Sequence, residues 1–130
     1  MLARVLFSVA LIGAAVACGK GDGAAGGGGP RDGVTSAWKK GGMTLSPLTA
    51  ATVTVGKDCQ SGTVGAIDVL LCVYPTAAEA KAAEERGLAW VGEATGAAQA
   101  AGTVLIAAAD RRKSDPSGRT INQLMKLAPK

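Results

Sequence analysis

This chain of 130 residues contains no histidine, and aromatic residues make up 3% of it. Histidine is the usual general base of hydrolases and the commonest ligand of transition metals in proteins. Without it, the serines in predicted loops lack the partner that would activate them as nucleophiles. We therefore expect a protein that is not an enzyme and that carries no metal and no cofactor.

A strong excess of charge of either sign is also missing. Fourteen lysines and arginines stand against ten aspartates and glutamates, which gives a net charge of +4. Domains that bind nucleic acid are usually far more basic than this. Nucleic acid is therefore not an expected partner.

What the chain does have is a distinctive start. Arg4 precedes an apolar run, Val5–Ala17, and the small residues Ala15-Val16-Ala17 stand directly before Cys18. A run of about thirteen residues is short for a membrane span, which needs about twenty, and fits the apolar core of a secretory signal. With a cysteine at the cleavage point, residues 1–18 resemble the signal peptide of a bacterial lipoprotein.

The resemblance implies that residues 1–17 are removed and that the Cys18 thiol receives a diacylglyceryl group. The protein would then be exported and anchored by lipid to a bacterial membrane, on the periplasmic side or at the cell surface. The membrane is thus the first expected partner. An uncut membrane-spanning helix and an ordinary cleaved signal are the alternatives for this segment.

Glycine dominates the segment that follows. Residues 19–31 read GKGDGAAGGGGPR, a composition with great backbone freedom and little to bury. We expect residues 18–31, with the lipidated cysteine, to form a tether. The remaining residues, 32–130, are expected to form one domain.

Local patterns predict a succession of helices and strands in that domain. They are a helix over 32–40, strands over 51–55 and 67–74, a helix over 76–90, an edge strand within 92–102, a strand over 103–109 and a last helix that opens at Asp115-Pro116. A short helical turn is the alternative for residues 92–102. The order predicts an α+β domain in which an antiparallel sheet of three to four strands carries helices mainly on one face.

Two of the helices carry start signals. Asp32 can cap the first helix, and Thr76 and Glu79 can form a capping box at the start of the second. The face of the second helix that we expect to lie against the sheet consists of small residues and one leucine: Ala80, Ala83, Gly87 and Leu88.

Cys59 and Cys72 are the remaining cysteines of the mature chain. Gly65-Ala66 has the form of a two-residue hairpin loop of type II′, which makes Val64 and Ile67 direct partners. The same register places the two cysteines opposite each other, in a non-hydrogen-bonded pair whose Cα atoms lie about 4.5 Å apart. A pair at this spacing can form a disulfide.

A two-thiolate metal site and a redox dithiol are the alternatives for these cysteines. A metal would need further ligands, but the chain offers neither histidine nor a third free cysteine. A redox pair usually has C-x-x-C spacing, which is absent. We therefore predict a structural disulfide that staples the hairpin and stabilises the fold by about 3 kcal/mol on the loop-entropy model.

Cations are densest in residues 110–120, DRRKSDPSGRT. The candidate anion site consists of the four cations of this segment: Arg111, Arg112, Lys113 and Arg119. They stand beside the predicted start of the last helix, where the helix dipole favours anions. The alternative is a solvated loop whose aspartates neutralise the cations and serve the helix start. The glycine spacing and the lysine of a phosphate-binding P-loop are absent.

Trp38 and Trp90 each lie near the end of a predicted helix. Core packing is the role we expect for both. A surface that stacks against carbohydrate or binds a partner is the alternative.

Together these features favour a non-enzymatic binding or structural module that is tethered to a membrane of the cell envelope. Its expected partner, besides the membrane, is an envelope protein or an anionic glycan or lipid. The alternative function is binding of a phosphate-bearing lipid or glycan by the loop 110–120. An enzyme of unfamiliar type is the third hypothesis.

Overall fold

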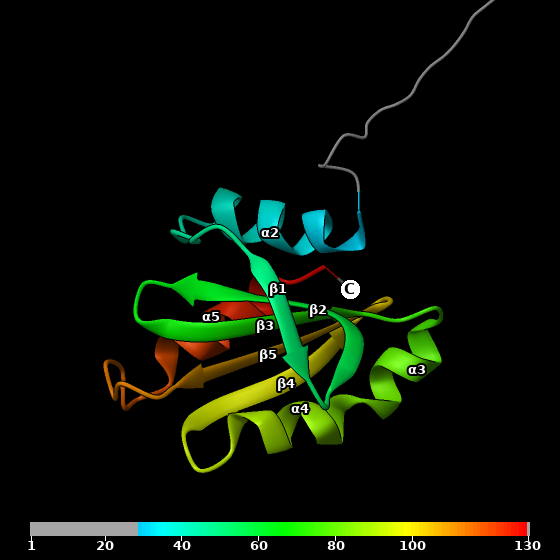
Figure 1. Ribbon diagram of the computed structural model, residues 1–130. Helices are drawn as coiled ribbons and strands as arrows, with labels where there is room; N and C mark the ends of the chain where they lie inside the picture. The colour runs from blue at the N-terminus through cyan, green and yellow to red at the C-terminus, as the bar shows by residue number, and fades with distance from the viewer. Residues whose placement is uncertain (1–28, 130) are drawn as a thin grey trace, which may run out of the picture.

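The computed structural model describes residues 29–129, so the predictions for residues 1–28 lie outside the described residues. Within residues 29–129 the chain forms one five-stranded antiparallel sheet and four helices (Figure 1). The elements in chain order are α2 (Pro30–Lys40), β1 (Thr49–Val53), β2 (Gly56–Val64), β3 (Ile67–Val73), α3 (Ala77–Ala82), α4 (Glu84–Val91), β4 (Thr95–Ala101), β5 (Val104–Asp110) and α5 (Arg119–Leu127). The strands lie in the order β1-β2-β3-β5-β4, so β1 and β4 are the edges.

The predicted α+β class is confirmed, but the sheet has five strands rather than three to four. Local apolar patterns predicted four strands, and the fifth is β2, the arm that the predicted hairpin sets opposite β3. Its sequence GKDCQSGTV contains two glycines and no clean alternation of apolar and polar residues. Pairing with β1 on one side and with β3 on the other holds this polar segment in the sheet. The predicted strand over 51–55 is the end of β1 together with the turn that leads to β2.

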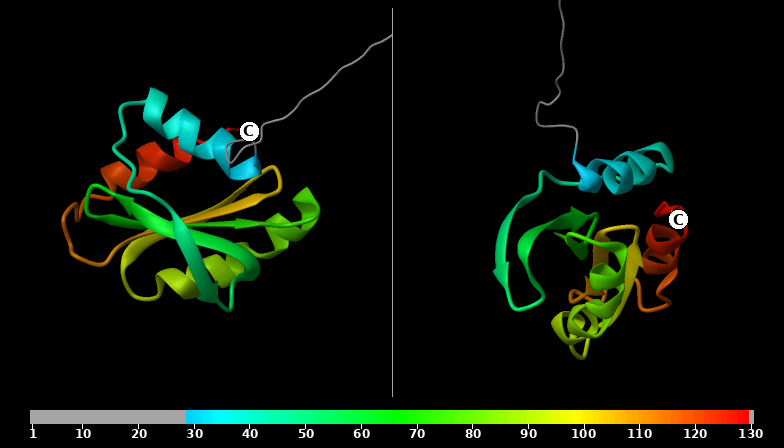
Figure 2. Two further views of the ribbon diagram at one scale, coloured as in Figure 1. Left: turned by 45° about the horizontal axis from the view of Figure 1, so that its top comes forward. Right: turned by 90° about the vertical axis from the view of Figure 1, so that its right-hand side faces the viewer.

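Helices cover both faces of the sheet, so the prediction that they lie mainly on one face is wrong (Figure 2). Trp38 of α2 and Leu124 of α5 belong to the same cluster as Leu71 of β3. On the opposite face, Ala83, at the junction of α3 and α4, clusters with Leu70. Leu70 and Leu71 are adjacent and both 0% exposed. Because successive residues of a strand point to opposite faces, β3 requires cover on both sides.

The first described helix begins two residues earlier than predicted. Pro30 occupies its first turn, where the missing N–H of proline costs no hydrogen bond, and Gly29 precedes it without a side-chain cap. Asp32, the predicted cap, instead lies in the first turn. The helix thus starts inside the segment that was predicted to be tether.

The helix predicted over 76–90 is divided into α3 and α4, which meet at Ala83. The capping box is confirmed in part. Thr76 Oγ1 accepts a hydrogen bond from Glu79 N at 3.1 Å. The Glu79 carboxylate, however, accepts from the Thr76 hydroxyl at 3.2 Å rather than from the backbone N–H.

The buried face of this helical region consists of small residues, as expected, but without its leucine. Ala80, Ala83 and Gly87 are buried. Leu88 is 52% exposed, so its predicted place against the sheet is wrong. At Gly87 an added Cβ would lie 2.9 Å from the Ala98 methyl, and this close approach lets α4 pack directly on β4.

The C-terminal part follows the predicted order with one shifted boundary. Residues 92–102 contain strand β4, and the strand predicted over 103–109 is β5. The last helix begins at Arg119 rather than at Asp115-Pro116. Those residues form a turn in which Gly118 N donates to Asp115 O at 2.9 Å. Gly118 has φ +74°, a conformation that glycine adopts without strain.

Candidate functional site

The disulfide-stapled hairpin is confirmed. β2 and β3 pair in the predicted register, with Val64 opposite Ile67 and Cys59 opposite Cys72. Gly65 has φ +60°, as the first residue of a type II′ turn requires. The two cysteines form a disulfide with a Cα–Cα distance of 4.0 Å, and both are buried. The bond ties β2 to the central strand β3.

Asp110 organises the loop between β5 and α5. It is 2% exposed, and its carboxylate accepts hydrogen bonds from Asp115 N at 2.7 Å, Ser114 N at 2.8 Å and Ser114 Oγ at 3.0 Å. The Asp115 N–H is the strongest influence that lowers the pKa of Asp110, against the opposing effect of burial. The buried carboxylate is therefore ionised and held by donors of its own loop.

Asp115 serves the start of α5. Its carboxylate accepts hydrogen bonds from Ser117 Oγ at 2.6 Å and from Thr120 N at 2.7 Å. These bonds, the one from Ser117 first, lower the pKa of Asp115 to about 2. Thr120 N is one of the backbone donors that the first turn of a helix leaves without an intrahelical partner. The aspartate thus has the role that the solvated-loop alternative assigned to it.

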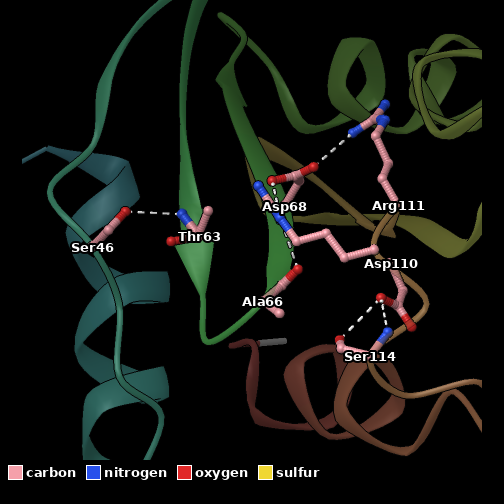
Figure 3. A network of polar contacts seen from close by, with 8 residues as sticks. Ser46, Thr63, Ala66, Asp68, Asp110, Arg111 and Ser114 are labelled. Carbon is pink, nitrogen blue, oxygen red and sulfur yellow. Dashed lines mark hydrogen bonds and ion pairs between the residues drawn. The ribbon is translucent and has the colours of Figure 1, made fainter.

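Asp68 of the stapled hairpin forms ion pairs with both Arg111 and Arg112 (Figure 3). Arg111 Nη1 lies 3.4 Å from Asp68 Oδ2, and Arg112 Nη1 lies 3.1 Å from Asp68 Oδ1. Arg112 also donates to Ala66 O at 2.8 Å, and Arg111 donates to Trp90 O. Two of the four candidate cations therefore bridge loop 110–120 to β3 and α4.

The other two candidate cations, Lys113 and Arg119, are exposed. Within residues 29–129 neither lies within 4.0 Å of a carboxylate oxygen. They line different hollows: Lys113 borders one of about 530 Å³ beside Arg111, and Arg119 borders one of about 440 Å³ beside Lys126. The structure thus brings Arg111 and Arg112 together but does not gather all four cations at one hollow.

The two tryptophans have different environments. Trp38 is 0% exposed and its Nε1 donates to Leu124 O at 2.9 Å, so the expected packing role is confirmed for it. Trp90 is half-buried, and the Arg111 guanidinium stacks 4.3 Å from the centre of its ring. It borders a hollow of about 430 Å³ together with Asp68 and Thr63. Trp90 is therefore both a packing residue and part of the surface.

A hollow of about 630 Å³ among the described residues was not predicted. It lies between the β1–β2 turn, the end of β3 and the helices α3 and α4. Arg86 Nε donates to Val55 O at 3.0 Å, and the Tyr74 hydroxyl donates to the same oxygen. Within the described residues, Arg86 and Lys57 of this hollow have no carboxylate oxygen within 4.0 Å. Three segments far apart in sequence supply these side chains, so no local pattern could reveal them.

The lipidation site predicted at Cys18 lies outside the described residues. Among residues 29–129 no three potential metal ligands gather, and no helix there is long and apolar enough to cross a bilayer. Comparison of the chain with protein-family models, with curated proteins and with solved structures finds no match. A functional assignment has to come from the residues themselves.

Proposed function

We propose that this protein is a lipoprotein tethered to a membrane of the bacterial cell envelope, where it acts as a non-enzymatic binding or structural module. The observation that carries the proposal is Cys18 placed directly after Ala15-Val16-Ala17 and the apolar run before them. A diacylglyceryl group supplies two acyl chains, and two chains suffice for stable anchoring where one does not. The Cys59–Cys72 disulfide supports export, because such bonds persist in oxidising compartments.

Metabolic labelling with a radioactive fatty acid tests the anchor. The protein should carry label and sediment with membranes, and Cys18→Ser should abolish the label. Cys59→Ser combined with Cys72→Ser is the matched control, because it removes the other cysteines and should leave labelling intact. Label that persists in Cys18→Ser would refute the proposed anchor.

Binding of anions is the second candidate function, and two groups of cationic side chains support it. Among residues 29–129, Lys113 and Arg119 of the loop have no carboxylate oxygen within 4.0 Å, whereas Arg111 and Arg112 pair with Asp68. In the hollow beside the β1–β2 turn, the hydrogen bond to Val55 O holds the Arg86 guanidinium at the wall. A guanidinium held in this way is suited to a carboxylate or phosphate group.

Titration with inorganic phosphate and with octanoate, at low and high salt, distinguishes the two places. Loss of binding in Arg86→Gln but not in Arg119→Gln assigns the anion to the hollow, and the reverse assigns it to the loop. Arg86→Lys is a control that keeps the charge. If neither ligand binds the unaltered protein with salt dependence, the anion hypothesis is wrong.

Cross-linking in native membranes addresses the partner. One dominant protein that survives high salt would identify an assembly or inhibitory module. Recovery of lipid or glycan alone, lost at high salt, would favour the anion-binding alternative.

A further inference from the structure

The register of the sheet shows which backbone groups of β1 face outward. Val64 and Ile67 flank a two-residue turn and therefore exchange hydrogen bonds across the β2–β3 pair. Alternate residues of β2 then point the other way, toward β1, and these are Thr63, Ser61 and Cys59. A bond from Ser46 N to Thr63 O, at 2.8 Å, agrees with this alternation.

The partners of Ser61 and Cys59 are Thr49 and Ala51, so these two residues of β1 bond inward. The intervening Ala50 must direct its N–H and C=O away from the sheet, and Thr52 does the same. The register shift after Ala51 places its extra residue in β2, since two steps along β1 match three along β2. The alternation along β1 is therefore continuous, and the side chains of Ala50 and Thr52 are exposed.

The opposite edge follows the same rule but is covered. Gly102-Thr103 joins β4 to β5 with Ala101 opposite Val104, which directs the backbone of Ala100 outward. Its N–H does not meet solvent, because the Glu84 carboxylate of α4 accepts it at 2.8 Å. The fold thus shields one edge with a helix and leaves the other without a partner within residues 29–129.

An open edge strand is a template for pairing with another strand, and proteins usually guard it with lysine, proline or inward-pointing charge. β1 reads TAATV and carries none of these. We propose that β1 pairs antiparallel with β1 of a second copy of this chain, so that one sheet runs through both copies.

A second copy fits this edge because β1 is complementary to itself. Antiparallel pairing centred on Ala51 sets Ala50 of each copy opposite Thr52 of the other, and these are the residues whose backbone groups face outward. At the centre the two Ala51 residues meet with small side chains, and Thr49 meets Val53 on either side. No like charges are brought opposite each other, which is a requirement for favourable cross-strand pairs.

The geometry also suits two copies anchored to one membrane. The two-fold axis of an antiparallel strand pair stands perpendicular to the sheet. It therefore places α2 of both copies on the same face, the face that α2 and α5 already cover (Figure 2). The first helix of each described chain, α2, then lies on that one side of the dimer. This step rests on the proposed lipid anchor.

The contact is small. Two five-residue strands bury well under the roughly 1,200 Å² of a stable interface, so pairing in dilute solution is weak. Two copies held on one surface meet at a high effective concentration, so that they can pair although their affinity in solution is low. Association should therefore depend on surface density.

The test uses the mature chain from Cys18, coupled through that thiol to vesicles that carry maleimide lipid. Coupling is specific because Cys59 and Cys72 are joined, and it supplies an anchor whether or not the cell acylates the protein. Exchange of individual amide hydrogens is compared at sparse and at dense coupling. The amides of Ala50 and Thr52 should exchange about tenfold more slowly at dense coupling, and the already bonded amide of Ala51 should not change.

Ala50→Lys combined with Thr52→Lys should abolish the density dependence through charge repulsion at the edge. Ala82→Lys combined with Ala89→Lys, which adds the same charge at exposed positions of α3 and α4, is the matched control and should retain it. Unchanged exchange at Ala50 and Thr52, or slow exchange already at sparse coupling, would overturn the proposal. Pairing on these vesicles combined with no fatty-acid label in cells would refute the anchor and leave the pairing intact.

Discussion

The two edge strands of the sheet are alike in composition and opposite in environment. β1 reads TAATV and β4 reads TGAAQAA, and neither contains a charged residue. β4 is largely half-buried, with α4 packed against it and Glu84 bound to its Ala100 N–H. In β1, most positions are exposed. A neighbouring helix, and not the residues of the strand itself, therefore protects the β4 edge.

The largest expected effect concerns the bond that fastens the exposed half of the sheet. Cys59→Ala combined with Cys72→Ala should lower the free energy of unfolding by about 3 kcal/mol, because the unfolded chain regains the freedom of a closed loop. Hydrogen exchange should accelerate first in β1 and β2, while β4 and β5 stay protected. Reduction of the unaltered protein is the control, since it breaks the same bond without removing sulfur. If hydrogen exchange accelerated equally in all five strands, the two edges of the sheet would not differ in stability as predicted.

The next prediction compares the loss of stability when valine is introduced into each of the two edge strands. At Gly96 of β4, an added Cβ would collide with Ala108 O and lie 2.5 Å from Val91 Cγ1. Gly96→Val should therefore cost about 1–3 kcal/mol of stability through overpacking. Ala50→Val on the exposed edge should change stability by less than about 0.5 kcal/mol. Urea unfolding measures both, and equal losses would show that the edges do not differ.

Removal of the hydrogen bond between α4 and β4 should lower the free energy of unfolding by a smaller amount. Glu84→Ala leaves the Ala100 N–H without its charged acceptor and should cost about 1 kcal/mol. The Ala100 amide should exchange faster as a result. Glu85→Ala, an exposed neighbour on the same helix, is the control and should be nearly neutral. No change in exchange at Ala100 would mean that the edge is covered by packing alone.

The smallest expected effect is a loss of stability in acid, which does not occur at neutral pH. Folding lowers the pKa of Asp110 and of Asp115, the latter to about 2. Their contribution to stability is therefore present above their ordinary pKa near 4 and is lost as the pH falls toward about 2. Exchange in the loop and in α5 should accelerate over that range before exchange in β1 does. Asp115→Asn should flatten part of this pH dependence, and an unaltered profile would show that the carboxylate is not responsible.

Sequence reasoning succeeded where a local rule determines a long-range contact. The Gly65-Ala66 turn fixes the pairing of β2 with β3, and Cys59 opposite Cys72 follows by counting. The edge strand within 92–102 was also predicted correctly, although its alanines and glycine favour no strand by propensity. In the structure, Gly102-Thr103 joins β4 to β5 as Gly65-Ala66 joins β2 to β3, but only the second turn entered the prediction.

It failed where distant segments decide the outcome. The hairpin predicted the pairing of β2 with β3, but the polar sequence of β2 gave no sign that β1 pairs with its other side. The cover on both faces depends on Leu70 and Leu71, whose continuous apolar run signals burial but does not say by what. Among the candidate site residues, Arg111 and Arg112 proved to be held by Asp68, 43 and 44 residues away. No spacing within loop 110–120 could reveal that carboxylate.

The two tryptophans lie on opposite faces of the sheet, Trp38 sealed among apolar side chains and Trp90 beneath the guanidinium of Arg111. This arrangement gives the molecule two separate optical reporters. Emission from Trp38 will follow the layer of α2 and α5, and emission from Trp90 will follow the salt bridges that join the loop to the hairpin. With one tryptophan replaced by phenylalanine at a time, a fluorimeter can watch each side of the sheet respond independently to a ligand, to a membrane or to acid.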